Sequence, residues 1–321
     1  MTSSSFQDRL GTTCRRFLEP TLVGLAVLLA LVGVFLFVRH LQTDPLVDIH
    51  AYYEAGERLN AGLPLYAAQG DVNSPHYYFY PPLLAIVFRP LALLPFQVAA
   101  IAWEIAMVAA FGVTLRLVGL RSRRTWIAVG LLGGPIAWSI TIGQAQVGVT
   151  LLLALGNPAA VALATQVKLF PALVALYWIG RRDWNSLGRY IGWSALLVLV
   201  QLILEPTGSL AFVSSTNLGL VGQVNNLSPY AISPLLWLAL VVGGTALALR
   251  LAPTRFGWAA SVAVSSLASP RLLGYALMTL LAGVHEPSGG REHASGDASM
   301  AKPPPDTQAR KAIPDGTSQS R

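Results

Sequence analysis

The chain has 321 residues, of which 54% are hydrophobic and only 12% are charged, and its mean hydropathy is +0.55. A soluble domain carries about 25% charged residues, so this composition excludes an ordinary soluble protein and predicts an all-α bundle of transmembrane helices. The single cysteine, Cys14, excludes an internal disulfide, and the net charge of +7 comes mostly from loop arginines that indicate topology rather than nucleic-acid binding.

The first apolar run, Thr21–Val38, is predicted to be a membrane span that is retained in the mature protein. It follows Arg15 and Arg16, and no small-residue cleavage site comes after it, which argues against a removed signal peptide. Residues 1–20 are therefore expected to form a cytoplasmic N-terminus.

A polar, aromatic-rich loop follows from Arg39 to Pro95 and carries Asp48 close to the membrane edge. Within it, Ile49–Ala61 is predicted to be a short amphipathic helix. The segment Leu83–Leu94 is apolar but short, so we expect it to lie flat at the membrane surface or to enter and return. Because a charge near the bilayer is costly, Asp48 is a candidate for function.

Nine further spans are predicted up to Val284, which gives about ten in total. Their expected bounds are Phe96–Val118, Trp126–Ile142, Val147–Gly156, Pro158–Val167, Phe170–Gly180, Tyr190–Leu204, Tyr230–Leu251, Phe256–Ala268 and Leu272–Val284. The three between Val147 and Gly180 are short and are interpreted as broken or half-length helices. Residues 285–321 are rich in Pro, Gly, Ser and Lys and are predicted to be a disordered cytoplasmic tail.

Arginines gather in alternate loops, and they predict the orientation of the bundle. They are Arg9, Arg15, Arg16, Arg116, Arg121, Arg123, Arg124, Arg181, Arg182, Arg189, Arg250 and Arg255. Because loop arginines favour the cytoplasm, these loops are assigned to that side. The opposite, extracytoplasmic side then holds Arg39–Pro95, Thr141–Gln146, Glu205–Pro229 and the corner Ser269–Arg271.

The first loop resembles the glycosyltransferase 87 family. The residues that carry the resemblance are Asp48, Tyr52–Tyr53, Ala55–Gly56, Gly62, Leu65–Tyr66, Tyr80–Leu83 and Pro90–Pro95. Less specific pieces that also fit are Gly143–Gln144, Lys168 with Pro171, Asn226–Ser228 and Ser269–Leu273. The resemblance covers about Pro20 to Gly283. It implies a GT-C fold over residues 21–284, in a bacterial plasma membrane.

The resemblance also implies a reaction. Known members transfer mannose from a polyprenyl-phosphate donor to a glycolipid or lipoglycan acceptor, outside the cytoplasm and with inversion at the sugar. It assigns Asp48 as the general base that takes the proton of the acceptor hydroxyl, a role that partial desolvation of a carboxylate favours. The alternative for Asp48 is a helix N-cap, and Asp44 is a rival carboxylate.

Two basic residues on the predicted outer side are candidates for binding the donor phosphate. A departing polyprenyl phosphate is an anion and needs a cation near it. Lys168 lies among apolar residues and Arg271 lies on the Ser-Pro corner. The alternatives are a lysine that reaches towards the membrane surface and an interfacial arginine anchor.

A further set of polar and aromatic residues is expected to bind the sugar or the acceptor. It consists of Tyr53, Tyr80, His50, Gln144, Asn225, Asn226 and Ser228. Tyrosines are enriched at membrane surfaces without any such role, and the amides and serine are equally consistent with helix caps.

No metal or other cofactor is expected, because the histidines are scattered along the sequence and no Asp-x-Asp or nucleotide-binding glycine motif is present. Two other functions remain open. A transporter or flippase would need ionisable residues within spans and a pseudo-repeated half, and apart from Glu104 the sequence lacks these signals. A shortened, inactive relative is suggested by Gln146 in place of the usual Asn, by the short Leu155–Pro158 connection and by fewer spans than a full-length member has.

Overall fold

The computed structural model describes residues 3–43, 45–66, 74, 76–215 and 225–286, with only the backbone described for 3–17 and 214–215. The predicted tail is therefore outside the described residues, apart from positions 285 and 286, and so is Asp44. The described residues belong to one compact unit, which is built from helices and contains no strand.

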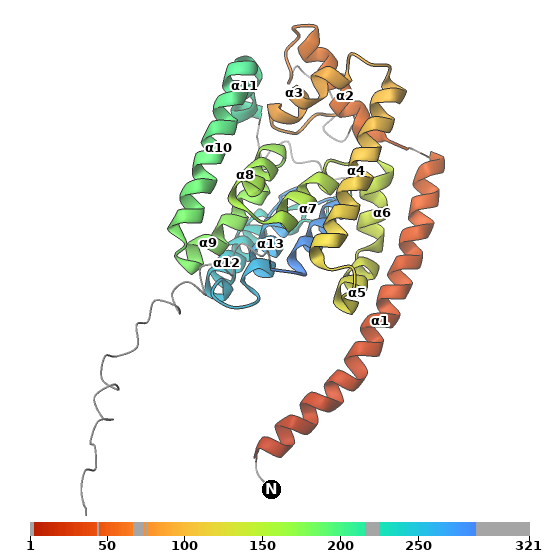
Figure 1. Ribbon diagram of the computed structural model, residues 1–321, viewed down its shortest axis with the longest axis vertical. Coiled ribbons are helices and arrows are strands. Elements are labelled where there is room, and N and C mark those ends of the chain that lie inside the picture. The colour runs from red at the N-terminus through yellow and green to blue at the C-terminus, as the bar shows by residue number, and fades with distance from the viewer. Residues whose placement is uncertain (1–2, 44, 67–73, 75, 216–224, 287–321) are drawn as a thin grey trace, which may run out of the picture. The chain divides into compact units, whose positions relative to one another are not determined.

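Most of the helices follow one another closely along the chain, and the longest connections lie between α2 and α3 and between α11 and η3 (Figure 1). In chain order they are α1 Ser3–Thr43, α2 Val47–Asn60, α3 Pro82–Leu91, α4 Phe96–Val118, α5 Arg123–Leu131, α6 Gly133–Thr141, α7 Gln146–Leu155, α8 Pro158–Val167, η1 Phe170–Ala175, α9 Leu176–Arg181, α10 Trp184–Leu204, α11 Pro206–Ser215, η3 Pro229–Ala231, α12 Pro234–Leu251, α13 Gly257–Leu267 and η4 Gly274–Gly283. The all-α prediction is confirmed.

Four helices in the described residues are long and apolar enough to cross a membrane: Leu18–Thr43 of α1, α4, α10 and α12. The shorter apolar helices α3, α7, α8, α13 and η4 have ten or eleven residues. An α-helix of that length is about 15 Å long, against a hydrocarbon core of about 30 Å. The chain is thus an integral membrane protein whose long helices are fewer than the ten predicted spans.

Several predicted bounds were wrong in an informative way. The span expected at Trp126–Ile142 is split into α5 and α6 at Leu132, just before two glycines. Helix α10 begins at Trp184 rather than Tyr190, because the Asp183 side chain caps it by accepting from the Ser186 amide. Helix α11 lies in a predicted loop, and the last predicted span is the 3-10 helix η4.

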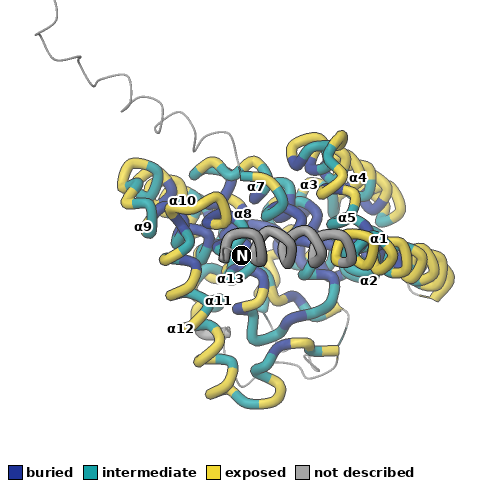
Figure 2. Tube along the Cα trace, turned by 90° about the horizontal axis from the view of Figure 1, so that it is seen from below, coloured by how far each residue is buried: buried dark blue, intermediate teal, exposed yellow. Residues whose placement is uncertain are grey.

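Long helices lie outside and short helices lie inside. The apolar windows of α1, α10 and α12 are only 11%, 6% and 6% buried, which fits helices that face lipid. Figure 2 shows the exposed residues along α1, α10 and α12, and buried residues between them. The short helices form the interior: α7 contacts α8 and η4, and η4 contacts α13.

The longest helix, α1, packs closely against α5 and α6 through small residues. A Cβ added at Gly33 would come within 2.5 Å of the Gly133 backbone, and one at Gly130 would meet Ala26. Between membrane helices, where lipid is as apolar as the side chains, such close backbone approach supplies much of the attraction.

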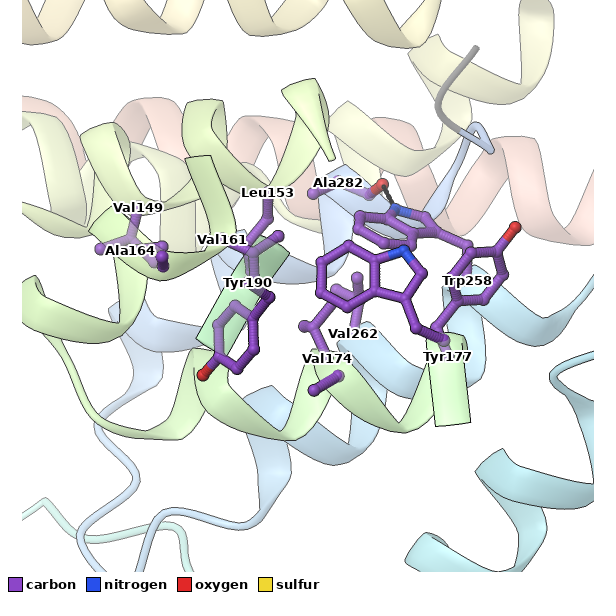
Figure 3. Close-up of a cluster of buried hydrophobic side chains, with 13 residues drawn as sticks. Val149, Leu153, Val161, Ala164, Val174, Tyr177, Tyr190, Trp258, Val262 and Ala282 are labelled. Atoms are coloured by element: carbon purple, nitrogen blue, oxygen red, sulfur yellow. Dashed lines mark hydrogen bonds between the residues drawn. The ribbon is translucent and has the colours of Figure 1, made fainter. Parts of the chain in front are cut away.

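An apolar core, here called the Trp258 core, joins α7, α8, η1, α9, α10, α13 and η4. Its larger members are Val149, Leu153, Val161, Val174, Tyr177, Trp178, Tyr190, Trp258 and Val262. Figure 3 shows Trp258 with its indole N–H donating to the Ala282 carbonyl at 3.0 Å. The Tyr177 ring meets it edge-on, with ring centroids 5.3 Å apart.

Helices α2 and α3 pack together beside the start of α4. Leu59, Leu65 and Phe88 are among the buried residues that join them. A Cβ at Gly56 would come within 2.8 Å of the Phe88 backbone, so this glycine permits the close approach. The α2–α3 pair lies at one end of the bundle in Figure 1, and the arginine-bearing helices α5 and α9 lie at the other.

Candidate functional site

Asp48 lies in the first turn of α2, directly above the turn between α6 and α7. The Leu46 amide donates to the Thr141 carbonyl at 2.9 Å, and the Asp48 amide donates to the Ile142 carbonyl at 3.1 Å. These two bonds dock the start of α2 on the end of α6. The N-cap position is Leu46 and no side chain caps the helix, so the capping alternative for Asp48 is wrong.

The turn that receives Asp48 requires glycine. Gly143 has a φ of 69°, and a Cβ there would overlap the Ile49 side chain. The Trp103 indole donates to the Gly143 carbonyl at 2.8 Å and fixes this turn against α4. As a result Gln144, the next residue, points into the protein and is fully buried.

Gln144 connects Asp48 with two tyrosines. Its amide Nε2 donates to Asp48 Oδ2, and its Oε1 accepts from the Tyr52 hydroxyl at 2.6 Å and from the Tyr80 hydroxyl at 3.1 Å. Because a carboxylate only accepts hydrogen bonds, this is the amide orientation that satisfies both ends. Burial raises the pKa of Tyr52 and of Tyr80 well above the usual value, so both hydroxyls remain protonated donors.

Lys168 reaches the same place from the end of α8. Its ammonium Nζ donates to Gln146 Oε1 at 2.7 Å, and Gln146 Nε2 donates to the Thr279 hydroxyl. The ammonium lies 4.8 Å from the Tyr275 ring centroid and 5.3 Å from that of Tyr80, within the range of cation–π attraction.

The charges of Lys168 and Asp48 act on each other. Burial lowers the pKa of Lys168 below the usual lysine value, and the charge of Asp48 opposes that shift. A carboxylate and an ammonium from distant parts of the sequence therefore belong to one group of polar and aromatic side chains. We call this group the polar cluster: Asp48, Tyr52, Tyr80, Gln144, Gln146, Lys168 and Tyr275.

Arg271 lies beside the polar cluster, on the corner between α13 and η4. Its guanidinium is 4.7 Å from the Phe79 ring centroid. Tyr275 interacts electrostatically with Asp48 and with Arg271, which places the arginine near the polar cluster. The two predicted phosphate-binding cations thus converge from two different segments.

Of the residues expected to bind sugar or acceptor, Tyr80 and Gln144 are in the polar cluster. Asn226 is engaged elsewhere: its Nδ2 donates to the Pro270 carbonyl, and its Oδ1 accepts from the amides of Ser228 and Leu272, each at 2.9 Å. These bonds hold the Arg271 corner in place. The Ser228 hydroxyl caps η3, and Asn225 is exposed with a φ of 56°.

Tyr53 and His50 lie on the part of α2 that packs on Phe96. The Tyr53 hydroxyl donates to the Leu94 carbonyl at 2.7 Å, and the His50 ring stacks on Phe96 with centroids 3.9 Å apart. The Tyr53 hydroxyl is thus bonded away from the polar cluster, and the His50 ring lies against Phe96.

Four residues of this site were not predicted from the sequence, and only one of them, Tyr52, could have been found from its spacing. Tyr52 follows Asp48 by four positions on one helix, so both lie on the same helix face, whereas Tyr53 does not. That spacing identifies Tyr52 as the better choice. Gln146, Tyr275 and Thr279 had no such signal, since only the packing of η4 on α7 brings them together.

A group of possible metal ligands lies next to the polar cluster. His50, Glu54 and His76 have ligand atoms within 4.8 Å of one another. Although the histidines are scattered along the sequence, the rings of His50 and His76 lie close together, with their centroids 5.2 Å apart.

Comparison with known proteins identifies a family for most of the chain. The model of glycosyltransferase family 87 matches residues 78–285, a range that contains Tyr80, Gln144, Lys168 and Arg271 and begins after Asp48. No solved structure matches the chain.

The chain is similar to three curated proteins from mycobacteria. A polyprenol-phosphate-mannose-dependent alpha-(1-2)-phosphatidylinositol pentamannoside mannosyltransferase of Mycolicibacterium smegmatis is 33% identical, over 53% of this chain and 45% of the relative. The protein of the same name from Mycobacterium tuberculosis is 30% identical, over 42% of this chain and 36% of the relative.

The third relative, a polyprenol-phosphate-mannose-dependent alpha-(1-2)-phosphatidylinositol mannoside mannosyltransferase of Mycolicibacterium smegmatis, is 28% identical, over 53% of this chain and 46% of the relative. The matched part of the chain spans less than half the length of each of these relatives. The family match covers well over half of the present chain, and on that ground the protein belongs to glycosyltransferase family 87.

Proposed function

We propose that the chain is an inverting mannosyltransferase that uses a polyprenyl-phosphate-linked mannose as donor and a glycolipid or lipoglycan as acceptor. The single observation that carries the proposal is the meeting of Asp48 and Lys168 in one polar cluster of an otherwise apolar membrane protein. The names of the relatives support the choice of donor, and their acceptors, phosphatidylinositol mannosides, support a glycolipid.

The proposed reaction uses the two charges in complementary ways. An acceptor hydroxyl oxygen attacks the anomeric carbon of the mannose, and Asp48 takes the hydroxyl proton. The bond between that carbon and the phosphate oxygen breaks with its electrons going to the oxygen. The donor phosphodiester thereby becomes a phosphomonoester with one more negative charge, which Lys168 and Arg271 stabilise. No step requires a metal ion or a soluble nucleotide.

Gln144 and Gln146 act as positioning residues in this scheme. Gln144 donates to Oδ2 of the Asp48 carboxylate and so fixes its orientation for the proton transfer. Gln146 holds the Lys168 ammonium and is itself fixed by Thr279. Gln146 stands at the position where the family usually has Asn, and its hydrogen bond to Lys168 supports the proposal of an active protein over that of an inactive relative.

We further propose that the site faces the extracytoplasmic side of a bacterial plasma membrane and that the N-terminus is cytoplasmic. The loop arginines support this orientation, because Arg123 and Arg181 lie on helices at the end of the bundle opposite α2 and α3 (Figure 1). Labelling of Cys14 tests it. A membrane-impermeant thiol reagent should label Cys14 only after the cells are lysed, and labelling in intact cells would reverse the orientation.

The central test is transfer of labelled mannose from synthetic polyprenyl-phosphate mannose by purified protein in lipid. Asp48→Asn should lower the rate by about 10²- to 10⁴-fold, the usual contribution of a general base. Glu57→Gln, an exposed carboxylate on the same helix, is the matched control and should retain the rate. Normal transfer by Asp48→Asn would remove Asp48 from the base role, and no transfer by the wild type would favour an inactive relative or a different donor.

A further inference from the structure

A second group of side chains, on α2 and in the segment before α3, contains residue types that bind metal ions. His50 and Glu54 are one turn apart on α2, so their side chains lie on the same face. His76 approaches them from the segment before α3, and its Nδ1 lies 2.6 Å from Glu54 Oε1. All three ligand atoms lie within 4.8 Å of one another.

The group consists of an ion pair, Glu54–His76, and a third possible metal ligand, His50. Glu54 and His76 are 46% and 45% exposed, and an exposed ion pair of this kind contributes only about 0–1 kcal/mol. The His50 ring could supply a third metal ligand, and its stacking on Phe96 at an interplanar angle of 16° holds it in position. Two protonated imidazoles at a ring distance of 5.2 Å would repel each other, whereas two neutral ones can share a cation.

The ligand set selects a class of metal. Two imidazoles and one carboxylate suit Zn²⁺ and its neighbours in the first transition series, which bind such ligands at about 2.0–2.2 Å. Three protein ligands leave one position of a tetrahedral ion for water. Small rotations of Glu54 and His76, both of which face solvent, are sufficient to bring three atoms that already lie within 4.8 Å around one ion.

We propose that His50, Glu54 and His76 form a binding site for a divalent transition-metal ion of the zinc class, with a structural role. Such an ion joins α2 to the segment that leads into Phe79 and Tyr80. Phe79 packs on Arg271 and Tyr80 belongs to the polar cluster, so the ion fixes one wall of that cluster without touching the reacting groups. The site does not depend on the proposed sugar transfer.

Zinc titration of the full-length protein in detergent tests the proposal. The protein is purified without an oligohistidine tag, and Zn²⁺ binding is measured by competition with a chromophoric chelator. One Zn²⁺ per chain should bind and raise the unfolding temperature. His76→Gln should weaken binding by at least about tenfold, since even partners of a metal ligand contribute that much. His40→Gln, which changes a histidine that bonds to the Leu36 carbonyl on α1, is the matched control.

A second variant keeps the test decisive if His76→Gln folds poorly. Glu54→Gln preserves size and hydrogen bonding on an exposed helix face, and it should weaken Zn²⁺ binding to a similar extent. Equal Zn²⁺ affinity of the wild type and both variants, or failure of the wild type to compete with the chelator, would overturn the proposal and leave a simple histidine–glutamate ion pair.

Discussion

The Trp258 core is buried and the polar cluster is partly buried, and the two consist of different kinds of side chain. In the Trp258 core the side chains are largely apolar, and the indole N–H has a backbone acceptor. In the polar cluster Gln144 and Gln146 are 0% and 4% exposed, and their amides are bonded to groups that carry or contact charge. Burying polar groups is costly unless each is paired. The comparison suggests that the core supplies stability, whereas the polar cluster is retained for chemistry.

The largest expected effect tests the claim that the Trp258 core supplies stability. Trp258→Ala leaves a cavity in the core and should lower the free energy of unfolding by about 3–5 kcal/mol. The rate of mannose transfer per folded molecule should change little, because Trp258 is outside the polar cluster. Unfolding in detergent measures the first quantity. Trp184→Ala is the control, since Trp184 is 62% exposed and its loss should have little effect.

The next effect tests the claim that the polar cluster carries out the chemistry. Lys168→Met removes the cation proposed to stabilise the departing phosphate, and it should slow transfer by about 10²- to 10³-fold, as does loss of one charge-stabilising donor in other enzymes. Stability should not fall in proportion, because a buried charge is costly. Arg89→Met removes a cation of α3 that bonds to Asn60 and should leave transfer unchanged. Similar rates for the two variants would refute the assignment.

A smaller effect is expected for Gln144. Gln144→Met removes a hydrogen bond to a charged group, which is worth about 1.5–3 kcal/mol, so turnover should fall by about 10- to 100-fold. Because Gln144 is proposed to orient Asp48 rather than to hold substrate, kcat should fall while KM stays nearly constant. Gln97→Met, at an exposed position of α4, is the control. A change confined to KM would make Gln144 a substrate-binding residue.

The smallest effect is a change in pH dependence. Burial lowers the pKa of Lys168, and only the ammonium form is positively charged, so wild-type transfer should decline with rising pH below the ordinary lysine value of about 10.4. In Lys168→Arg the guanidinium stays charged, and this alkaline decline should disappear. Initial rates measured for both proteins across this range decide the matter. An identical decline in both would assign it to another group.

Most of the helices could be predicted because their apolar runs are long. The bounds of α4 and α8 match the sequence expectation. Helix α11 was assigned to a loop, because its first residues include Pro206, Gly208 and Ser209, which are typical of loops. The number of spans was harder to predict, because short buried helices and short spans have the same composition.

The site was predicted less completely than the fold. Asp48, Gln144 and Lys168 were chosen from their motifs, and the structure brings them together. Tyr53 was preferred to Tyr52, although the spacing of Asp48 and Tyr52 placed the latter on the correct face. Gln146, Tyr275 and Thr279 depend on contacts between α7 and η4, which are far apart in sequence and have no local signature.

The measurement that most directly tests whether Asp48 and Lys168 act as one site is a double-mutant cycle on mannose transfer. Rates are compared for the wild type, Asp48→Asn, Lys168→Met and the double variant. If the two residues serve one transition state, the double variant should be little slower than the slower single variant, since groups that act as a unit are not additive. Losses that simply multiply would mean that the two residues act independently and would contradict the proposed site.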